Sequence, residues 1–122
     1  MLKILITGGA GYLGSVLSRE LLGKGHQVRV LDSLMHGGQA ILPLYSDDNF
    51  SFIAGDVRSE DDLNSALVQV DAVVHLAAIV GDPACARQPE LAREINLDAA
   101  LRTFQLSQRH GVERFIFAST CS

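Results

Sequence analysis

Three glycines, Gly8, Gly11 and Gly14, stand at regular intervals directly after an apolar run at residues 2–6. The run has the length and composition of a buried strand, and apolar side chains recur at helical spacing after Gly14. Glycine allows a tight turn between such a strand and helix, and it lets backbone approach a ligand closely. The free N–H groups at the start of the helix attract negative charge. The pattern therefore predicts a loop that cradles a pyrophosphate.

A carboxylate follows the next apolar run along the chain. Residues 27–31 are expected to form a second strand, and Asp32 stands at its end, 18 residues beyond Gly14. A carboxylate there can accept hydrogen bonds from the adenosine ribose of a dinucleotide, and it repels the 2′-phosphate of NADP. No Lys or Arg in residues 33–48 offsets this repulsion. Asp32 therefore favours NAD as the ligand, the alternative being an aspartate that only forms a turn.

Strand and helix patterns alternate along the rest of the chain. Strands are expected at residues 2–6, 27–31, 49–54, 72–78 and 113–119. Helices are expected from residue 14 to about 23 and from about 90 to 109. A further helix is expected to begin at Ser59, where Asp62 completes a capping-box-like start. Residues 33–48 are expected to be a long loop with at most one helical turn. This alternation predicts an α/β fold, a Rossmann-type doubly wound parallel sheet with strand order 3-2-1-4-5.

Ligands of such sheets bind at the carboxyl ends of the strands. These ends carry small or polar groups after every expected strand: Gly8 to Gly14, Asp32, Asp56 with Val57, Leu76 with Ala77 and Ala78, and Ser119 with Thr120. Asp56 could accept from the adenine amino group, and Val57 could pack on the ring. Ala77 and Ala78 would let backbone approach the nicotinamide half. Any one group could be an ordinary turn at a strand end, but their coincidence indicates a dinucleotide site.

Composition and charge limit the classes of function. A chain of 122 residues is expected to form one domain, and the net charge of −4 with scattered basic residues argues against nucleic acid as a partner. No apolar run approaches the roughly 20 residues of a membrane span, and no signal peptide is recognised. Cys85 and Cys121 lack metal-ligand spacing. We therefore expect a reduced, cytoplasmic protein without a metal.

Several segments together resemble the extended short-chain dehydrogenase/reductase family, and more narrowly its NAD-dependent nucleotide-sugar epimerase/dehydratase branch. The segments are residues 7–14, Asp32, residues 55–57, residues 75–78, Ile95-Asn96 and residues 115–120. They occur in the order and at the spacing of the family, and the resemblance covers the whole chain. It is specific to the family but not to one enzyme.

The resemblance implies a role for each matching position. The backbone of Tyr12 and Leu13 would hold the pyrophosphate, Asp32 the adenosine ribose with Ser33 to Gly37 along its edge, Asp56 and Val57 the adenine, and Leu76 to Val80 the nicotinamide half. Thr120 matches the catalytic Ser/Thr, whose hydroxyl bonds the substrate hydroxyl that is oxidised. Asn96 would support the cofactor or its loop, or else is an ordinary helix residue. His75 is expected to be a packed strand residue rather than a catalytic base.

The family's Tyr-x-x-x-Lys pair, which lies beyond the Ser/Thr strand, is absent from this sequence. Residues 1–122 are therefore expected to be the NAD-binding N-terminal portion of a longer enzyme, truncated after the fifth strand and inactive alone. Cys121 and Ser122 stand where the family's dehydratases carry Asp-Glu, which favours epimerisation or plain oxidoreduction of a nucleotide sugar over dehydration. The alternatives are a dehydratase, an NADP-linked reductase and a non-enzymatic NAD sensor. The family often dimerises through helices, so a homodimer is a further expectation.

Overall fold

The fold is a five-stranded parallel sheet between two layers of helices. The computed structural model describes residues 1–34, 38–76 and 89–117, and for residues 89–96 the backbone alone. The elements in chain order are β1 (Lys3–Thr7), α1 (Tyr12–Gly23), β2 (Gln27–Asp32), the 3-10 helix η1 (Gln39–Ser46), β3 (Phe50–Ala54), α2 (Glu60–Ala66), β4 (Ala72–His75), α4 (Pro89–Arg109) and β5 (Arg114–Phe117). The strand order is β3-β2-β1-β4-β5, and every neighbouring pair is parallel. The predicted fold class and strand order are confirmed.

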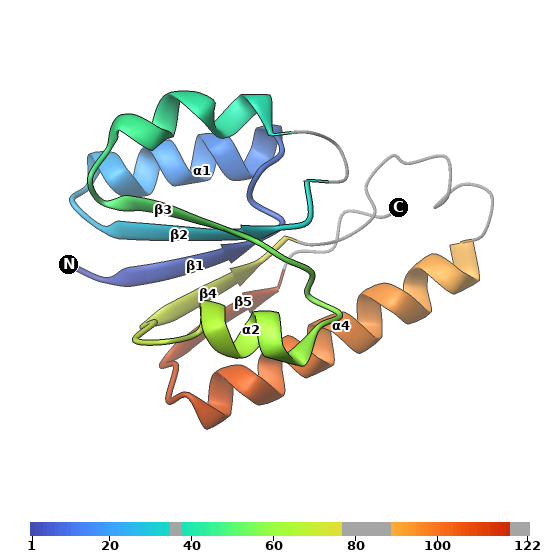
Figure 1. Cartoon of the computed structure of the whole chain (residues 1–122). Coiled ribbons are helices and arrows are strands. Elements are labelled where there is room, and N and C mark those ends of the chain that lie inside the picture. Colours follow the sequence, from blue (N-terminus) through green and yellow to red (C-terminus); the bar gives the residue numbers. More distant parts are fainter. Residues whose placement is uncertain (35–37, 77–88, 118–122) are drawn as a thin grey trace.

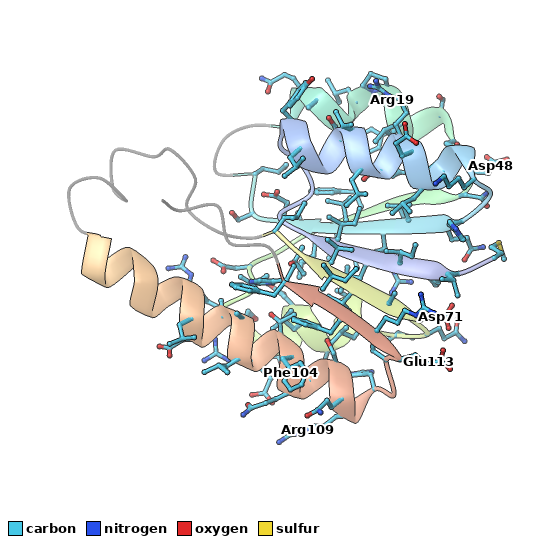
Figure 2. All side chains as sticks on the ribbon, turned by 180° about the vertical axis from the view of Figure 1, so that it is seen from behind. Arg19, Asp48, Asp71, Phe104, Arg109 and Glu113 are labelled. Atoms are coloured by element: carbon cyan, nitrogen blue, oxygen red, sulfur yellow. The ribbon has the colours of Figure 1, made fainter. Side chains whose placement is uncertain are left out.

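Helices α1 and η1 cover one face of the sheet, and α2 and α4 cover the other (Figure 1). On the α4 side, Phe104 meets Phe115 of β5 edge-on, with ring centroids 5.4 Å apart (Figure 2). Within the described ranges, no helix is both long and apolar enough to cross a membrane.

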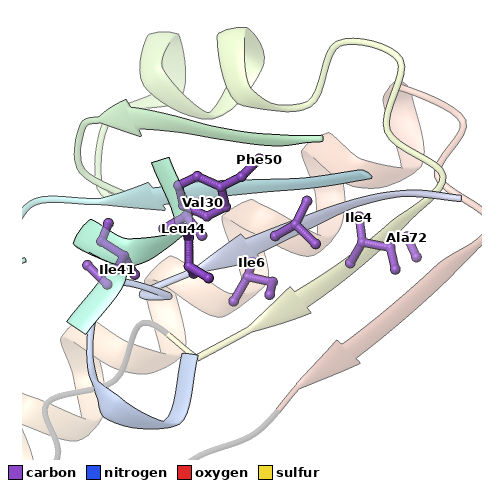
Figure 3. Packing of buried hydrophobic residues seen from close by; sticks show 9 residues of the cluster. Ile4, Ile6, Val30, Ile41, Leu44, Phe50 and Ala72 are labelled. Atoms are coloured by element: carbon purple, nitrogen blue, oxygen red, sulfur yellow. The ribbon is translucent and has the colours of Figure 1, made fainter. Parts of the chain in front are cut away.

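The central strand divides its apolar side chains between the two faces. Ile4 and Ile6 of β1 are buried with Val30, Ile41 and Phe50 on the α1 and η1 side (Figure 3). Leu5, which lies between them in the sequence, is buried on the opposite side in a cluster that includes residues of α2 and α4. This alternation follows from the two-residue period of a strand, and it makes both faces of β1 core. Because all the strands are parallel, their carboxyl ends lie together at one edge of the sheet.

Residues 39–46, between β2 and β3, are helical where the sequence predicts a loop. Gln39–Ser46 forms η1 instead of a loop with one helical turn. Ile41 and Leu44 are its buried residues, and a spacing of three places two side chains on the same face of a 3-10 helix. Tyr45 also lies near Phe50, with ring centroids 5.7 Å apart. Packing onto the sheet therefore orders a segment whose turn-forming composition predicts a loop.

The start of α2 differs from the predicted capping box in one contact. Ser59 is the N-cap and its hydroxyl accepts the Asp62 N–H at 3.3 Å, as predicted. The Asp62 carboxylate, however, accepts the backbone N–H of Asp56 at 2.9 Å, while the Ser59 N–H donates to the Asp56 carbonyl. Asp62 therefore ties the loop after β3 to the helix instead of closing the box.

Candidate dinucleotide-binding site

The glycine loop runs from the end of β1 to the start of α1. Gly8 has φ +74°, in the left-handed region that favours glycine, and its N–H donates to the Leu31 carbonyl at 2.8 Å. Gly11 is the N-cap of α1, and no side chain caps the helix. Tyr12 and Leu13 are exposed and begin the first turn of α1. The N–H groups of a first turn have no acceptor within the helix. The loop therefore presents backbone donors at a helix N-terminus, as an anion site requires.

Gly14 and Gly11 differ in how much space surrounds them. A Cβ at Gly14 would lie 2.3 Å from the Gly9 Cα, so α1 rests directly on the backbone of the loop. A Cβ at Gly11 would meet no atom within 4 Å. The space in front of α1 is thus open at the position where a pyrophosphate would approach the backbone. The residues present fit a dinucleotide phosphate group.

Asp32 contacts the glycine loop from the neighbouring strand. Its Oδ2 accepts the Ala10 N–H at 2.9 Å, and its Oδ1 accepts the Leu34 N–H at 2.8 Å. The bond from Leu34 closes a local turn, so Asp32 does form a turn, as the alternative interpretation proposed. The bond from Ala10 shows that Asp32 also contacts the glycine loop directly. A carboxylate offers about four acceptor sites, so capacity remains for ribose hydroxyls. Ser33, which follows, is exposed.

Asp56 lies in the loop after β3 and forms an ion pair that sequence reasoning missed. Arg58 Nη2 lies 2.7 Å from Asp56 Oδ2, and the Arg58 backbone N–H donates to Oδ1 at 2.8 Å. The hydrogen-bonded guanidinium holds the pKa of Asp56 below its ordinary value, against a smaller opposing effect of burial. Val57, the next residue, packs partly against the core on the α2 side. The available signal was the Asp-x-Arg spacing, since an aspartate commonly bonds backbone two residues on.

Two buried polar residues lie beneath the cradle at the ends of β1 and β4. The Thr7 Oγ1 and His75 Nδ1 atoms are 2.7 Å apart, and both side chains are buried. The His75 ring lies nearly parallel to that of Phe117, with centroids 5.6 Å apart. Burial lowers the pKa of His75 to about 4, so the imidazole is neutral at neutral pH. His75 is therefore a packed strand residue, as expected.

The remaining predicted residues are only partly covered by the described structure. Leu76 directly follows β4, and its N–H donates to the Thr7 carbonyl at 2.8 Å. Asn96 lies within α4, where the backbone alone is described. Ala77, Ala78 and Thr120 lie outside the described residues. The structure therefore brings the glycine loop, Asp32, Asp56 and Leu76 to one edge of the sheet, and the predicted roles of all site residues stay predictions.

Residues 4–122 match the family model described as the NAD dependent epimerase/dehydratase family. The chain belongs to this family. It is 32% identical to a UDP-glucose 4-epimerase of Klebsiella pneumoniae, with 99% of this chain and 91% of that sequence covered. The NAD expectation is thereby confirmed at the level of the family.

Solved structures of family members share the fold. A Thermus thermophilus UDP-glucose 4-epimerase in complex with NAD superposes with a TM-score of 0.82 at 32% identity, over 97% of this chain and 37% of that one. A Streptomyces venezuelae dTDP-glucose 4,6-dehydratase with NAD bound gives 0.83 at 32% identity, over 93% and 38%. The chain thus spans just over a third of these two enzymes, and it is as similar to an epimerase as to a dehydratase.

Gly14 and Gly11 make a matched pair for testing the packing of the cradle. We expect Gly14→Ala to lower the free energy of unfolding by about 2–3 kcal/mol, because its Cβ collides with backbone that cannot rotate away. Gly11→Ala places its Cβ in open space and should stay within about 0.5 kcal/mol of the parent. Urea unfolding followed by circular dichroism measures both. Equal stability of the two variants would contradict the packing described.

The buried His75 predicts a pH dependence of stability. Its pKa in the folded chain, about 4, lies below the ordinary value of 6.5, so the unfolded chain binds the proton more readily between these values. Stability should therefore fall as the pH drops from 6.5 to 4, with a contribution of at most about 1.4 kcal/mol per pH unit. Urea unfolding of the parent and of His75→Gln across this range isolates the contribution, because carboxylates titrate in both proteins. An identical slope in the two proteins would show that His75 does not titrate as described.

Proposed function

We propose that this chain binds NAD at the carboxyl edge of its sheet, as the cofactor-binding portion of a nucleotide-sugar epimerase or related oxidoreductase. The observation that carries the proposal is the open space over Gly11, beside a carboxylate that contacts the same loop. A ligand seated there would meet backbone N–H donors on one side and the Asp32 acceptors on the other. A pyrophosphate joined to an adenosine ribose matches both.

The predicted site residues divide the proposed cofactor between them. The N–H groups of Tyr12 and Leu13 bind the pyrophosphate, and Asp32 binds the adenosine ribose with Ser33 along its edge. Asp56 and Val57 frame the adenine, and the segment from Leu76 through Ala77 and Ala78 runs beside the nicotinamide half. Asn96 supports the cofactor or its loop. When bound, NAD accepts a hydride from a sugar carbon and returns it.

Epimerisation or plain oxidoreduction is proposed in preference to dehydration. The support is the pair Cys121 and Ser122, which supplies neither of the carboxyl groups that water elimination uses in the family's dehydratases. Thr120 is proposed to bond the substrate hydroxyl, a role for which a non-enzymatic NAD sensor has no use. The NADP-linked alternative is disfavoured by the charge of Asp32.

The same proposal covers the length of the whole enzyme, its substrate class, its oligomeric state and its location. Residues 1–122 form one domain of a longer enzyme. The support is that the two compared enzymes of known structure in the family extend to about two and a half times this length. The longer enzyme acts on a nucleotide sugar, and its Tyr-x-x-x-Lys pair lies outside this sequence, so these residues alone do not turn over a sugar. A homodimer and a cytoplasmic location complete the proposal.

The Asp32 carboxylate should set the choice between NAD and NADP. We expect the parent chain to bind NAD more tightly than NADP, and Asp32→Asn to lower that preference by about 10-fold or more. Asparagine keeps an acceptor for the Ala10 N–H but removes the charge that repels a 2′-phosphate. Isothermal titration with each dinucleotide measures the preference.

The matched control is Asp48→Asn, which removes the same charge from an exposed turn before β3 (Figure 2). This variant should keep the preference of the parent. Tighter binding of NADP than NAD by the parent chain would overturn the proposed role of Asp32. Absence of NAD binding would overturn the proposed function itself.

A further inference from the structure

Asp56 and Arg58 are joined by more hydrogen bonds than an ordinary surface ion pair. Arg58 Nε lies 3.1 Å from both Oδ1 and Oδ2 of Asp56, Nη2 lies 2.7 Å from Oδ2, and the Arg58 backbone N–H adds a bond of 2.8 Å to Oδ1. Both oxygens are therefore engaged, and the carboxylate is held in one orientation. The two side chains are 33% and 58% exposed, and pairs so exposed contribute little to stability. Their geometry therefore needs another explanation.

The backbone that carries this pair is held from two helices. From α2, the Asp62 carboxylate accepts the Asp56 N–H. From α4, Arg102 Nη1 donates to the Arg58 carbonyl at 3.1 Å, across 44 residues of sequence. A Cβ on Gly55 would lie 2.9 Å from the Asp62 carboxylate, so a larger residue here would displace that side chain from its present position. The loop is thus fixed before any ligand is present.

The pair also lies next to the place proposed for the adenosine ribose. Gly55, the residue before Asp56, donates its N–H to the Asp32 carbonyl at 3.1 Å. Adenine attached to a ribose at the Asp32 side chain would therefore meet the loop at Asp56. The 6-amino group of adenine is a donor, and a carboxylate is its natural acceptor.

We propose that Arg58 is a positioning residue for adenine recognition, which orients the Asp56 carboxylate so that one acceptor site faces the 6-amino group, and that Arg102 holds Arg58 in place. The inference rests on the proposed NAD site. Three N–H groups of Arg58 contact the carboxylate, and Nε–H is shared between the two oxygens. A carboxylate has about four acceptor sites, so one site is left for a donor when Nε–H bonds one oxygen alone.

The test compares NAD with nicotinamide hypoxanthine dinucleotide, which carries a 6-oxo acceptor in place of the 6-amino donor. Isothermal titration of the 122-residue chain should show about 10-fold or greater preference for NAD, from one charge-assisted hydrogen bond. Arg58→Ala should reduce this preference to about 2-fold while binding of the hypoxanthine analogue changes little. Arg58→Lys, which keeps the charge without the planar fork, and Arg102→Ala should give intermediate preferences.

Arg19→Ala is the matched control, because Arg19 is an exposed arginine on α1, across the sheet from α2 and α4 (Figure 2). It should keep the preference of the parent, and unchanged melting temperatures identify the variants that stay folded. An equal loss of affinity for both dinucleotides in Arg58→Ala, or a preserved preference, would overturn the inference while the NAD site stands. A loss of preference in Arg19→Ala as large as that in Arg58→Ala would also overturn it. If the parent chain bound neither dinucleotide, the proposed function would fail and the inference with it.

Discussion

The contact between α1 and the glycine loop is the constraint on which the candidate site depends. Because Gly14 has no side chain, the first turn of α1 lies directly on the backbone of Gly9. Gly9 in turn fits against Ile6 and Val30, so the loop is packed from the sheet as well as from the helix. A backbone held from both sides has its N–H groups oriented before any anion arrives. Binding then needs little further ordering of the protein.

A series of hydrogen bonds joins the residues that follow β1, β3 and β4 to the last residues of the neighbouring strands β2 and β1. The bonds run from Gly8 to Leu31, from Gly55 to Asp32 and from Leu76 to Thr7, all between backbone groups. They extend the pairing of the parallel strands by one step beyond the sheet. Side chains that are far apart in the sequence are thereby fixed relative to one another. Asp32 is central to this arrangement because its carbonyl and its carboxylate bind two different loops.

The sequence predicts the features that rest on local patterns. Strand order follows from the alternation of apolar runs and helices, and the glycine spacing places the cradle at the correct turn. The helix at residues 39–46 was missed because it depends on Ile41 and Leu44 packing onto a sheet formed by distant residues. The contact between Arg102 and Arg58 likewise joins segments 44 residues apart, and no local pattern encodes it. Position in the sequence also leaves open which of two backbone N–H donors, that of Ser59 or that of Asp56, the Asp62 carboxylate accepts.

The central claim is that the carboxyl edge of the sheet holds NAD through the backbone of the glycine loop and the side chain of Asp32. The most direct measurement is the change in backbone amide resonances when NAD is added to the isotope-labelled chain. The account predicts that the largest shifts fall on residues 8–14, 32–34 and 55–57, with residues at the amino ends of the strands nearly unchanged. Shifts centred on another surface, or none at saturating NAD, would contradict it.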